Sequence, residues 1–96
     1  ALFFLYKNMN ILEKANQIVN ERSEEKERQY GNFIECMEKT ARIASELSNK
    51  KITTNDTYNI LIALKLARQA NAHKEDNLLD VVAYIGSLNE LLNQKK

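Results

Sequence analysis

Four charged side chains in the second half of the sequence form two pairs on either side of a polar stretch. Lys65 and Arg68 precede this stretch, and Asp76 and Asp80 follow it. Three of them, Lys65, Arg68 and Asp80, interrupt apolar runs, and a charge carried into an apolar interface needs a partner or a ligand. Basic groups suit phosphate, and carboxylates suit a hard cation such as Mg²⁺. These residues are therefore the first candidates for chemistry.

The spacing of the four charges predicts that they lie together. If residues 71–74 form a turn between two antiparallel helices, residues equally far from its centre lie at the same height. This places Lys65 opposite Asp80, and Arg68 near Asp76. The acids are four positions apart and the bases three, so each pair shares one helix face. The cluster either closes on itself as salt bridges or also binds a metal or a phosphate.

Helices are needed to position these charges, and the composition favours them. The 96 residues include no proline and only two glycines, so the strongest helix breakers are nearly absent. Apolar positions recur at helical spacing and predict four helices. Their expected limits are a start near Asn10, Asn32 to Asn49, Thr53 to Asn71, and Glu75 to Asn93. The expected fold is all-α, a compact bundle of about four helices in which the last two form an antiparallel hairpin.

The last two expected helices are apolar on nearly all sides. Such helices are usually buried, and the first two helices offer too little surface to cover both of them. We therefore expect the third helix to be central and the chain to form a homo-oligomer. In the fourth helix, Ala83, Gly86 and Ser87 form a patch of small residues that another helix could approach.

Length and composition limit the organisation of the chain. Met9 directly precedes the first expected helix, so we interpret residues 1–8 as an N-terminal extension and residues 9–96 as a single helical domain. The apolar stretch in the extension falls far short of the roughly 20 residues that span a bilayer, so we expect no membrane partner. One cysteine cannot form an internal disulfide, and no signal peptide is recognisable, which favours a cytoplasmic protein.

Charge and residue types exclude further classes. Fourteen basic and thirteen acidic residues leave a net charge of +1, so a nucleic-acid partner is disfavoured despite the basic pairs at residues 50–51 and 95–96. The chain has one cysteine, one histidine and no glycine-rich turn before a helix, which rules out a catalytic triad, a zinc site and a phosphate loop. We interpret His73 as a polar turn residue and Cys36 as a small buried hydrophobe.

Two further carboxylates could complete a metal site with those of the hairpin. Glu35 and Glu38 are three positions apart and share one face of the second helix, although Lys39 and Arg42 offer them ordinary ion pairs. If that helix converges with the fourth, two glutamates and two aspartates would supply the oxygen ligands that Mg²⁺ prefers. The candidate metal ligands are Glu35, Glu38, Asp76 and Asp80, and the candidate phosphate contacts are Lys65 and Arg68.

These acidic pairs resemble the MazG-like, all-α nucleoside triphosphate pyrophosphohydrolases. That family carries two glutamates three positions apart in one helix and a Glu-x-x-Asp pattern in a later one. Glu35 and Glu38 match the first pattern. The second reads Asn77-Leu78-Leu79-Asp80, with Asp76 one position before the asparagine. The resemblance implies a Mg²⁺-dependent protein that binds or hydrolyses a nucleotide.

A second resemblance extends from Met9 to about Leu92 and is to small bacteriophage proteins of uncharacterised function, which are distantly similar to the same pyrophosphohydrolases. It rests on charged and aromatic residues spread over the chain, namely Arg22 or Arg28, Tyr30-Gly31, Lys65, Arg68, Asp76, Asp80 and Tyr84. This likeness implies a location in the cytoplasm of a bacterial host cell.

Two functional hypotheses follow. In the first, a phage-type protein binds a nucleotide with Mg²⁺ as cofactor, or hydrolyses it as a pyrophosphohydrolase; the metal would neutralise phosphate oxygens and orient water. In the second, a non-catalytic interaction protein inhibits a host enzyme or defence system through protein–protein contacts. The hairpin charges are then structural, with Lys65 paired to Asp80 and Arg68 to Asp76, and loss of Asp80 would cost several kcal/mol of stability.

Overall fold

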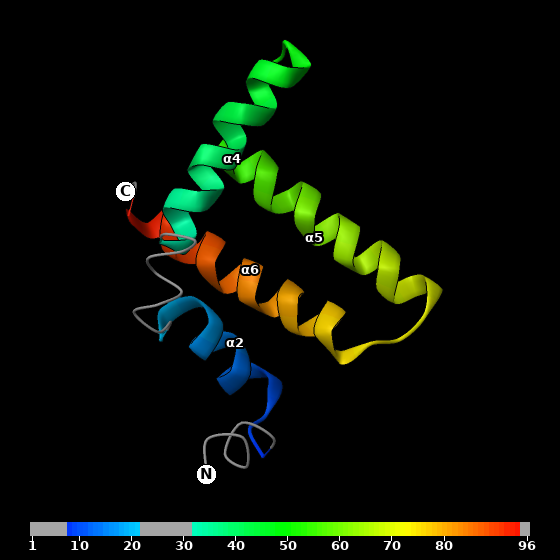
Figure 1. Ribbon diagram of the computed structural model, residues 1–96. Helices are drawn as coiled ribbons and strands as arrows, with labels where there is room; N and C mark the ends of the chain where they lie inside the picture. Colours follow the sequence, from blue (N-terminus) through cyan, green and yellow to red (C-terminus); the bar gives the residue numbers. More distant parts are fainter. Residues whose placement is uncertain (1–7, 22–31, 95–96) are drawn as a thin grey trace.

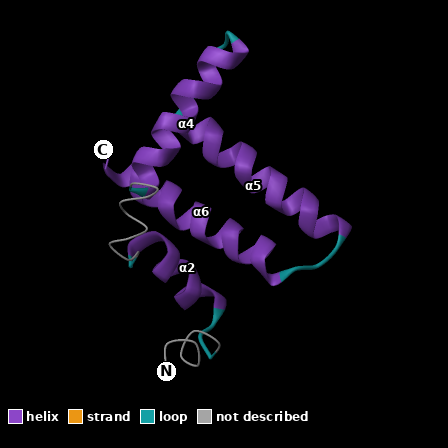
Figure 2. Cartoon of the chain, viewed as in Figure 1, coloured by secondary structure: helices purple, strands orange, loops and turns teal. Residues whose placement is uncertain are grey.

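The computed structural model describes residues 8–21 and 32–94, and within them it contains four helices and no strand (Figures 1 and 2). The helices are α2 (Ile11–Asn20), α4 (Phe33–Ser48), α5 (Thr54–Asn71) and α6 (Glu75–Gln94). The expected all-α fold of about four helices is confirmed. Residues 1–7 of the expected extension, residues 22–28 with their arginines, and Tyr30-Gly31 lie outside the described residues.

Polar residues at the expected helix starts cap the helices. Asn10 Oδ1 accepts a hydrogen bond from the Glu13 N–H (2.9 Å), and Asn32 caps α4 in a similar way. Thr53 and Asp56 form a reciprocal capping box in which each side chain accepts from the other residue's N–H (3.0 Å each). These local bonds explain why the observed starts of α2, α4 and α5 match the sequence so closely.

α6 is the central helix. It packs broadly against α5 on one side and α2 on the other, while α4 crosses it near its C-terminal end (Figure 1). The close packing of the last two helices is thus confirmed, but the expectation that α5 would be central is wrong. α5 contacts α6 with one face only, and large apolar side chains remain exposed elsewhere on it, namely Ile60, Leu64 and Leu66.

Two separate clusters of apolar side chains form the core. Between α2 and α6, Ala15, Leu79 and Ala83 are buried with aliphatic neighbours. Where α4, α5 and α6 meet, the core is built around Met37, Tyr58 and Leu91. This second cluster also includes aromatic rings whose centroids lie 5.9 to 6.5 Å apart, within the range of favourable ring contacts.

The C-terminal half of α4 extends past the other helices (Figure 1). Leu47 is 81% exposed, and Ile43 is also exposed. α6 contacts α4 only near the start of α4, and therefore does not reach the side chains of its C-terminal half. The radius of gyration, 14.6 Å, exceeds the value of about 12 Å expected for a compact chain of this length. The bundle is therefore more open than expected.

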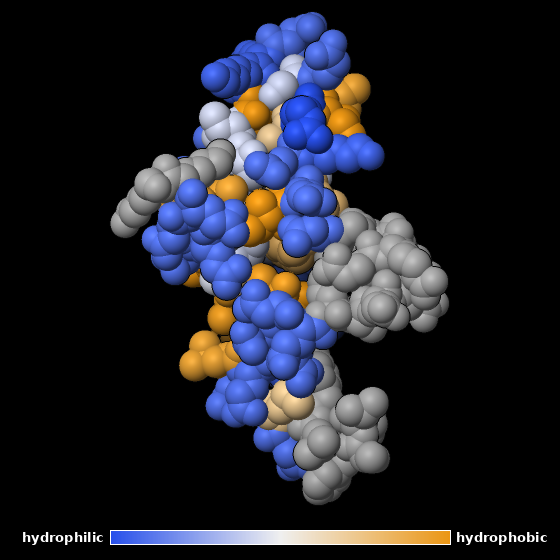
Figure 3. Space-filling model, turned by 90° about the vertical axis from the view of Figure 1, so that its left-hand side faces the viewer, coloured by the Kyte–Doolittle hydropathy of each residue, from blue (hydrophilic) through white to orange (hydrophobic). Residues whose placement is uncertain are grey.

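Apolar residues reach the surface between hydrophilic ones on the face seen in Figure 3. Among the described residues, no helix is long and apolar enough to cross a membrane. The exposed apolar residues therefore lie on helices that also carry polar and charged side chains.

Candidate functional site at the turn between α5 and α6

The hairpin contains the ion pair that its mirror spacing predicts. Lys65 Nζ lies 2.9 Å from Asp80 Oδ2, and the two side chains are 19% and 32% exposed. Because α5 and α6 are antiparallel and joined by a short turn, the two residues reach the same height from opposite helices. The Lys65 charge is thus balanced within the hairpin. Burial raises the pKa of Tyr84, one turn further along α6, and the Asp80 carboxylate raises it further.

Arg68 and Asp76 behave differently. Both side chains are exposed, and no ion pair joins them in the part of the chain that the structure describes. The residue at the mirror position of Arg68 is Asn77, which is buried in the hairpin. Asp76 is one position earlier, about 100° around α6, and therefore lies outside the interface.

A second ion pair, which the hairpin spacing did not indicate, joins α2 to the start of α6. Lys14 Nζ lies 2.8 Å from Glu75 Oε1. The hydrogen bond and the charge of Lys14 hold the pKa of the Glu75 carboxyl below its usual value. Lys14 interrupts the apolar stripe between Ile11 and Ala15. This interruption is the one feature of the local sequence that could have indicated a charged partner for Lys14.

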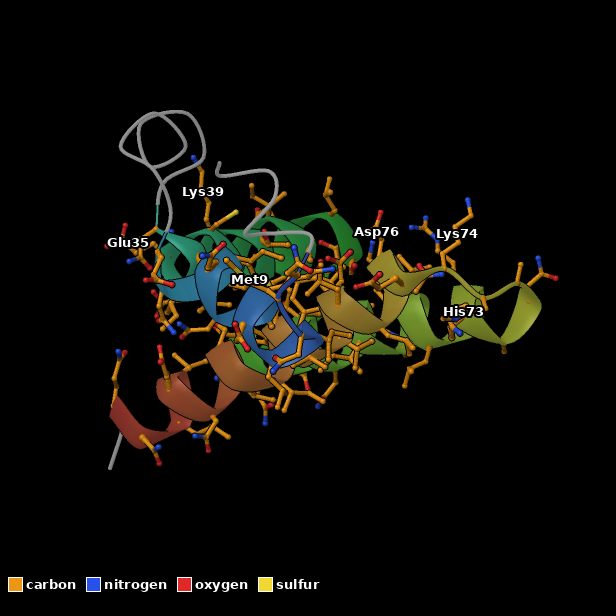
Figure 4. The ribbon with its side chains drawn as sticks, turned by 90° about the horizontal axis from the view of Figure 1, so that it is seen from below. Met9, Glu35, Lys39, His73, Lys74 and Asp76 are labelled. Carbon is orange, nitrogen blue, oxygen red and sulfur yellow. The ribbon has the colours of Figure 1, made fainter. Side chains whose placement is uncertain are left out.

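The four candidate metal ligands do not converge. Glu35 and Asp76 lie well apart in Figure 4, with Glu35 at the left end and Asp76 to the right of the centre. α4 meets α6 near Leu91, which is about 16 Å along the helix from Asp80. Within residues 8–21 and 32–94, no group of three or more His, Cys, Asp or Glu side chains could hold a metal ion. The expected four-carboxylate site is therefore not assembled within one chain.

A pocket of about 600 Å³ opens at the turn, and we call it the hairpin pocket. It is lined by residues at the end of α5, in the turn and at the start of α6: Ala67, Arg68, Asn71, Ala72, Lys74 and Asn77. Two of these are cationic, two carry amides, and no carboxylate lines the pocket. The first turn of α6 carries Glu75 and Asp76, which offset the partial positive charge of its N–H groups, so the cationic character of the pocket comes from Arg68 and Lys74. The pocket therefore suits an anion.

The turn that carries Lys74 is held by a side chain of α5. Gln69 Oε1 accepts a hydrogen bond from the Lys74 N–H (3.1 Å), and Gln69 Nε2 donates to His73 Nδ1 (2.6 Å). His73 therefore helps to hold the turn through its hydrogen bond with Gln69, as expected for a polar turn residue. Figure 4 shows His73 and Lys74 at the same end of the molecule as Asp76.

Cys36 and the small-residue patch of α6 both differ from the sequence-based expectation. Cys36, expected to be buried, is exposed on α4. The expected small-residue patch of α6 is divided, because Ala83 and Ser87 are buried while Gly86 is exposed with open space where a Cβ would lie. Gly86 instead borders an apolar groove of about 170 Å³ between α2 and α6, which also includes Leu12 and Val82.

Comparison with known proteins gives a family but no activity. Neither a curated protein nor a solved structure matches the chain. Residues 10–92 match a domain of unknown function, DUF6378, and this range covers all four described helices up to Leu92. The chain therefore belongs to the DUF6378 family.

Proposed function

We propose that this protein binds a phosphorylated ligand of the nucleotide class in the hairpin pocket. The observation that carries the proposal is the presence of Arg68 and Lys74 in one pocket without a lining carboxylate. A guanidinium binds phosphate oxygens in a bidentate manner, and an ammonium adds a compact charge. The volume of about 600 Å³ lies within the range typical of small-molecule sites.

The residues of the pocket have separate roles in this proposal. Arg68 and Lys74 bind the phosphate groups, and the amides of Asn71 and Asn77 orient the rest of the ligand. Lys65, the other expected phosphate contact, acts through its ion pair with Asp80, which fixes α5 against α6. Of the two expected phosphate contacts, the proposal thus keeps Arg68 as a direct one.

Hydrolysis is not part of this proposal. A pyrophosphohydrolase needs carboxylates around a hard cation, and those of α4 and α6 are not gathered within one chain. The resemblance of the acidic pairs to those of MazG-like enzymes supports a nucleotide as ligand class. Mg²⁺ would bind together with the nucleotide, because it is held mainly by phosphate oxygens and water and needs few protein ligands.

The test is a calorimetric titration of the full chain with nucleoside triphosphates and with inorganic pyrophosphate, each with and without Mg²⁺. We expect Arg68→Gln and Lys74→Gln to weaken binding about tenfold or more, as expected for loss of a charge-assisted contact. Lys51→Gln, at an exposed lysine of the α4–α5 turn, is the matched control. Absence of binding by the unmodified chain, or equal weakening by all three substitutions, would refute the proposal.

A parallel assay of phosphate and pyrophosphate release tests the step that the proposal leaves out. Binding without turnover agrees with a nucleotide-binding protein. Mg²⁺-dependent turnover that is lost in Glu38→Gln would show that carboxylates of α4 act after all, and would extend the function to hydrolysis.

The second candidate function is a non-catalytic interaction protein that binds a host protein. A specific observation favours it: the groove between α2 and α6 is lined by apolar side chains with a few polar ones among them, and Leu12 is exposed beside it. Capture from bacterial extract tests this candidate. A captured protein that is lost with Leu12→Glu, but retained with Arg68→Gln and with Leu92→Glu at another exposed leucine, would favour it over nucleotide binding.

A further inference from the structure

We propose that α5 packs in an antiparallel manner against α5 of a second copy of this chain. The contact surface, called here the α5 outer face, consists of Ile60, Ala63, Leu64 and Ala67. All four side chains are exposed, and Ile60 and Leu64 are 57% and 42% exposed. The occupant is a second copy because the face complements itself in shape and in charge.

The α5 outer face lies opposite the face that packs on α6. Tyr58 and Leu61 belong to the core with α6, and Lys65 pairs with Asp80. At 3.6 residues per turn, the four residues of the outer face lie within an arc of about 100° centred on the other side of the helix. α5 is thus apolar on two opposite sides, and among residues 8–21 and 32–94 only one of them is covered.

The shape of the outer face fits an identical face in reverse. A two-fold axis between positions 63 and 64 places Ile60 opposite Ala67 of the second copy, and Leu64 opposite Ala63. Each large side chain then meets a methyl group across the interface, at every level of the contact. Alternation of large and small residues across facing positions lets two helices interdigitate closely. A two-fold interface requires just this kind of self-complementary surface.

Charge selects the antiparallel orientation. α5 has the acidic Asp56 in its first turn and the basic Arg68 in its last turn. In an antiparallel pair, the acidic end of each helix faces the basic end of the other, and the helix dipoles also oppose each other. A parallel pair would place like charges together at both ends. A partner helix without this distribution of charge would lack these favourable end-to-end contacts.

The expected affinity is moderate. α5 has 18 residues and is therefore about 27 Å long. A single helix pair buries less than the roughly 800 Å² per partner that stable interfaces reach. We therefore expect a dissociation constant in the micromolar range, so that the mass of the particle depends on protein concentration.

Sedimentation equilibrium of the full chain over the micromolar range tests this inference. The unmodified chain should shift from monomer to dimer as the concentration rises. Leu64→Glu should raise the dissociation constant at least about tenfold, because the two introduced carboxylates would be buried close together beside the two-fold axis. Leu66→Glu is the matched control, since Leu66 is 46% exposed on the same helix but outside the outer face. A chain that stays monomeric, or equal effects of both substitutions, would overturn the inference.

Cross-linking locates the contact. In a Cys36→Ser background, Leu64→Cys should give a disulfide-linked dimer on mild oxidation, whereas Leu66→Cys should not. Equal cross-linking at the two positions would contradict the antiparallel pair. Ala67 belongs to both the outer face and the hairpin pocket, so the variants that separate dimerisation from nucleotide binding lie elsewhere: Lys74→Gln leaves the outer face intact, and Leu64 does not line the hairpin pocket.

Discussion

In its first half α6 meets its neighbours through two ion pairs, Lys14 with Glu75 and Lys65 with Asp80, beside a small aliphatic cluster that includes Leu79. In its second half it packs around the buried ring of Tyr58, with other aromatic rings partly buried beside it. We call these the ionic half and the aromatic half. The aromatic half surrounds Tyr58, whose hydroxyl shares a hydrogen bond of 2.5 Å with Ser87 Oγ; both residues are fully buried.

The two halves contribute unequally to stability, and the ionic half leaves an exposed pocket that a ligand can enter. Burying a tyrosine removes a large apolar surface from water and contributes several kcal/mol. The ion pairs are partly exposed, so solvent screens them and each contributes little. The hairpin pocket lies in the ionic half, where substitutions can alter binding without unfolding the chain.

The largest expected effect is that of Tyr58→Ala in the aromatic half. It removes a fully buried aromatic side chain and should lower the free energy of unfolding by about 4 kcal/mol, measured by urea denaturation. The matched control is Leu66→Ala, at an exposed position of the same helix, which should change it by less than about 0.5 kcal/mol. Similar effects of the two substitutions would mean that the aromatic half is not the stable core.

A smaller effect is expected from Tyr58→Phe. This change keeps the ring but leaves the buried Ser87 hydroxyl without its partner, at a cost of about 1 to 2 kcal/mol. The double variant with Ser87→Ala should recover part of that loss, because neither side then has an unsatisfied polar group. A double-mutant cycle in urea measures the coupling, and a coupling energy near zero would argue against the hydrogen bond.

Asp80→Ala tests the ionic half. The carboxylate is about one-third exposed, so its loss should cost about 1 kcal/mol, and not the several kcal/mol expected for a fully buried pair. Asp76→Ala, an exposed carboxylate four positions earlier on the same helix, is the control and should have almost no effect. Equal denaturation midpoints for the two variants would show that the Lys65–Asp80 pair adds nothing in solution.

The Lys14–Glu75 ion pair should make the free energy of unfolding depend slightly on pH, and this change should be smaller than the others. The folded-state pKa of Glu75 lies below its usual value of 4.5, so its contribution is present above that value and is lost as pH falls through the folded pKa. Denaturation curves between pH 7 and pH 3 should show this loss in the unmodified chain but not in Glu75→Gln. The difference should shrink in high salt, because Glu75 is exposed.

Much of the hairpin could be predicted because its determinants are local. The polar stretch at residues 71–74, the apolar periodicity and the equal spacing of Lys65 and Asp80 fix two antiparallel helices and their register. A short turn leaves little freedom for the two helices to slide past each other. The convergence of Glu35 and Glu38 with the hairpin acids could not be predicted in this way, because it depends on where α4 crosses α6.

Local sequence patterns were enough to predict the helices, the caps at Asn10, Asn32 and Thr53, and the pairing of Lys65 with Asp80. Hydrogen bonds and contacts between residues close in the chain decide these features. The packing of distant helices was needed to establish that α6 is central, that Lys14 reaches Glu75, and that the described residues leave one apolar side of α5 exposed. Periodicity shows which sides of a helix are apolar, but the crossing of distant helices decides which of those sides is covered.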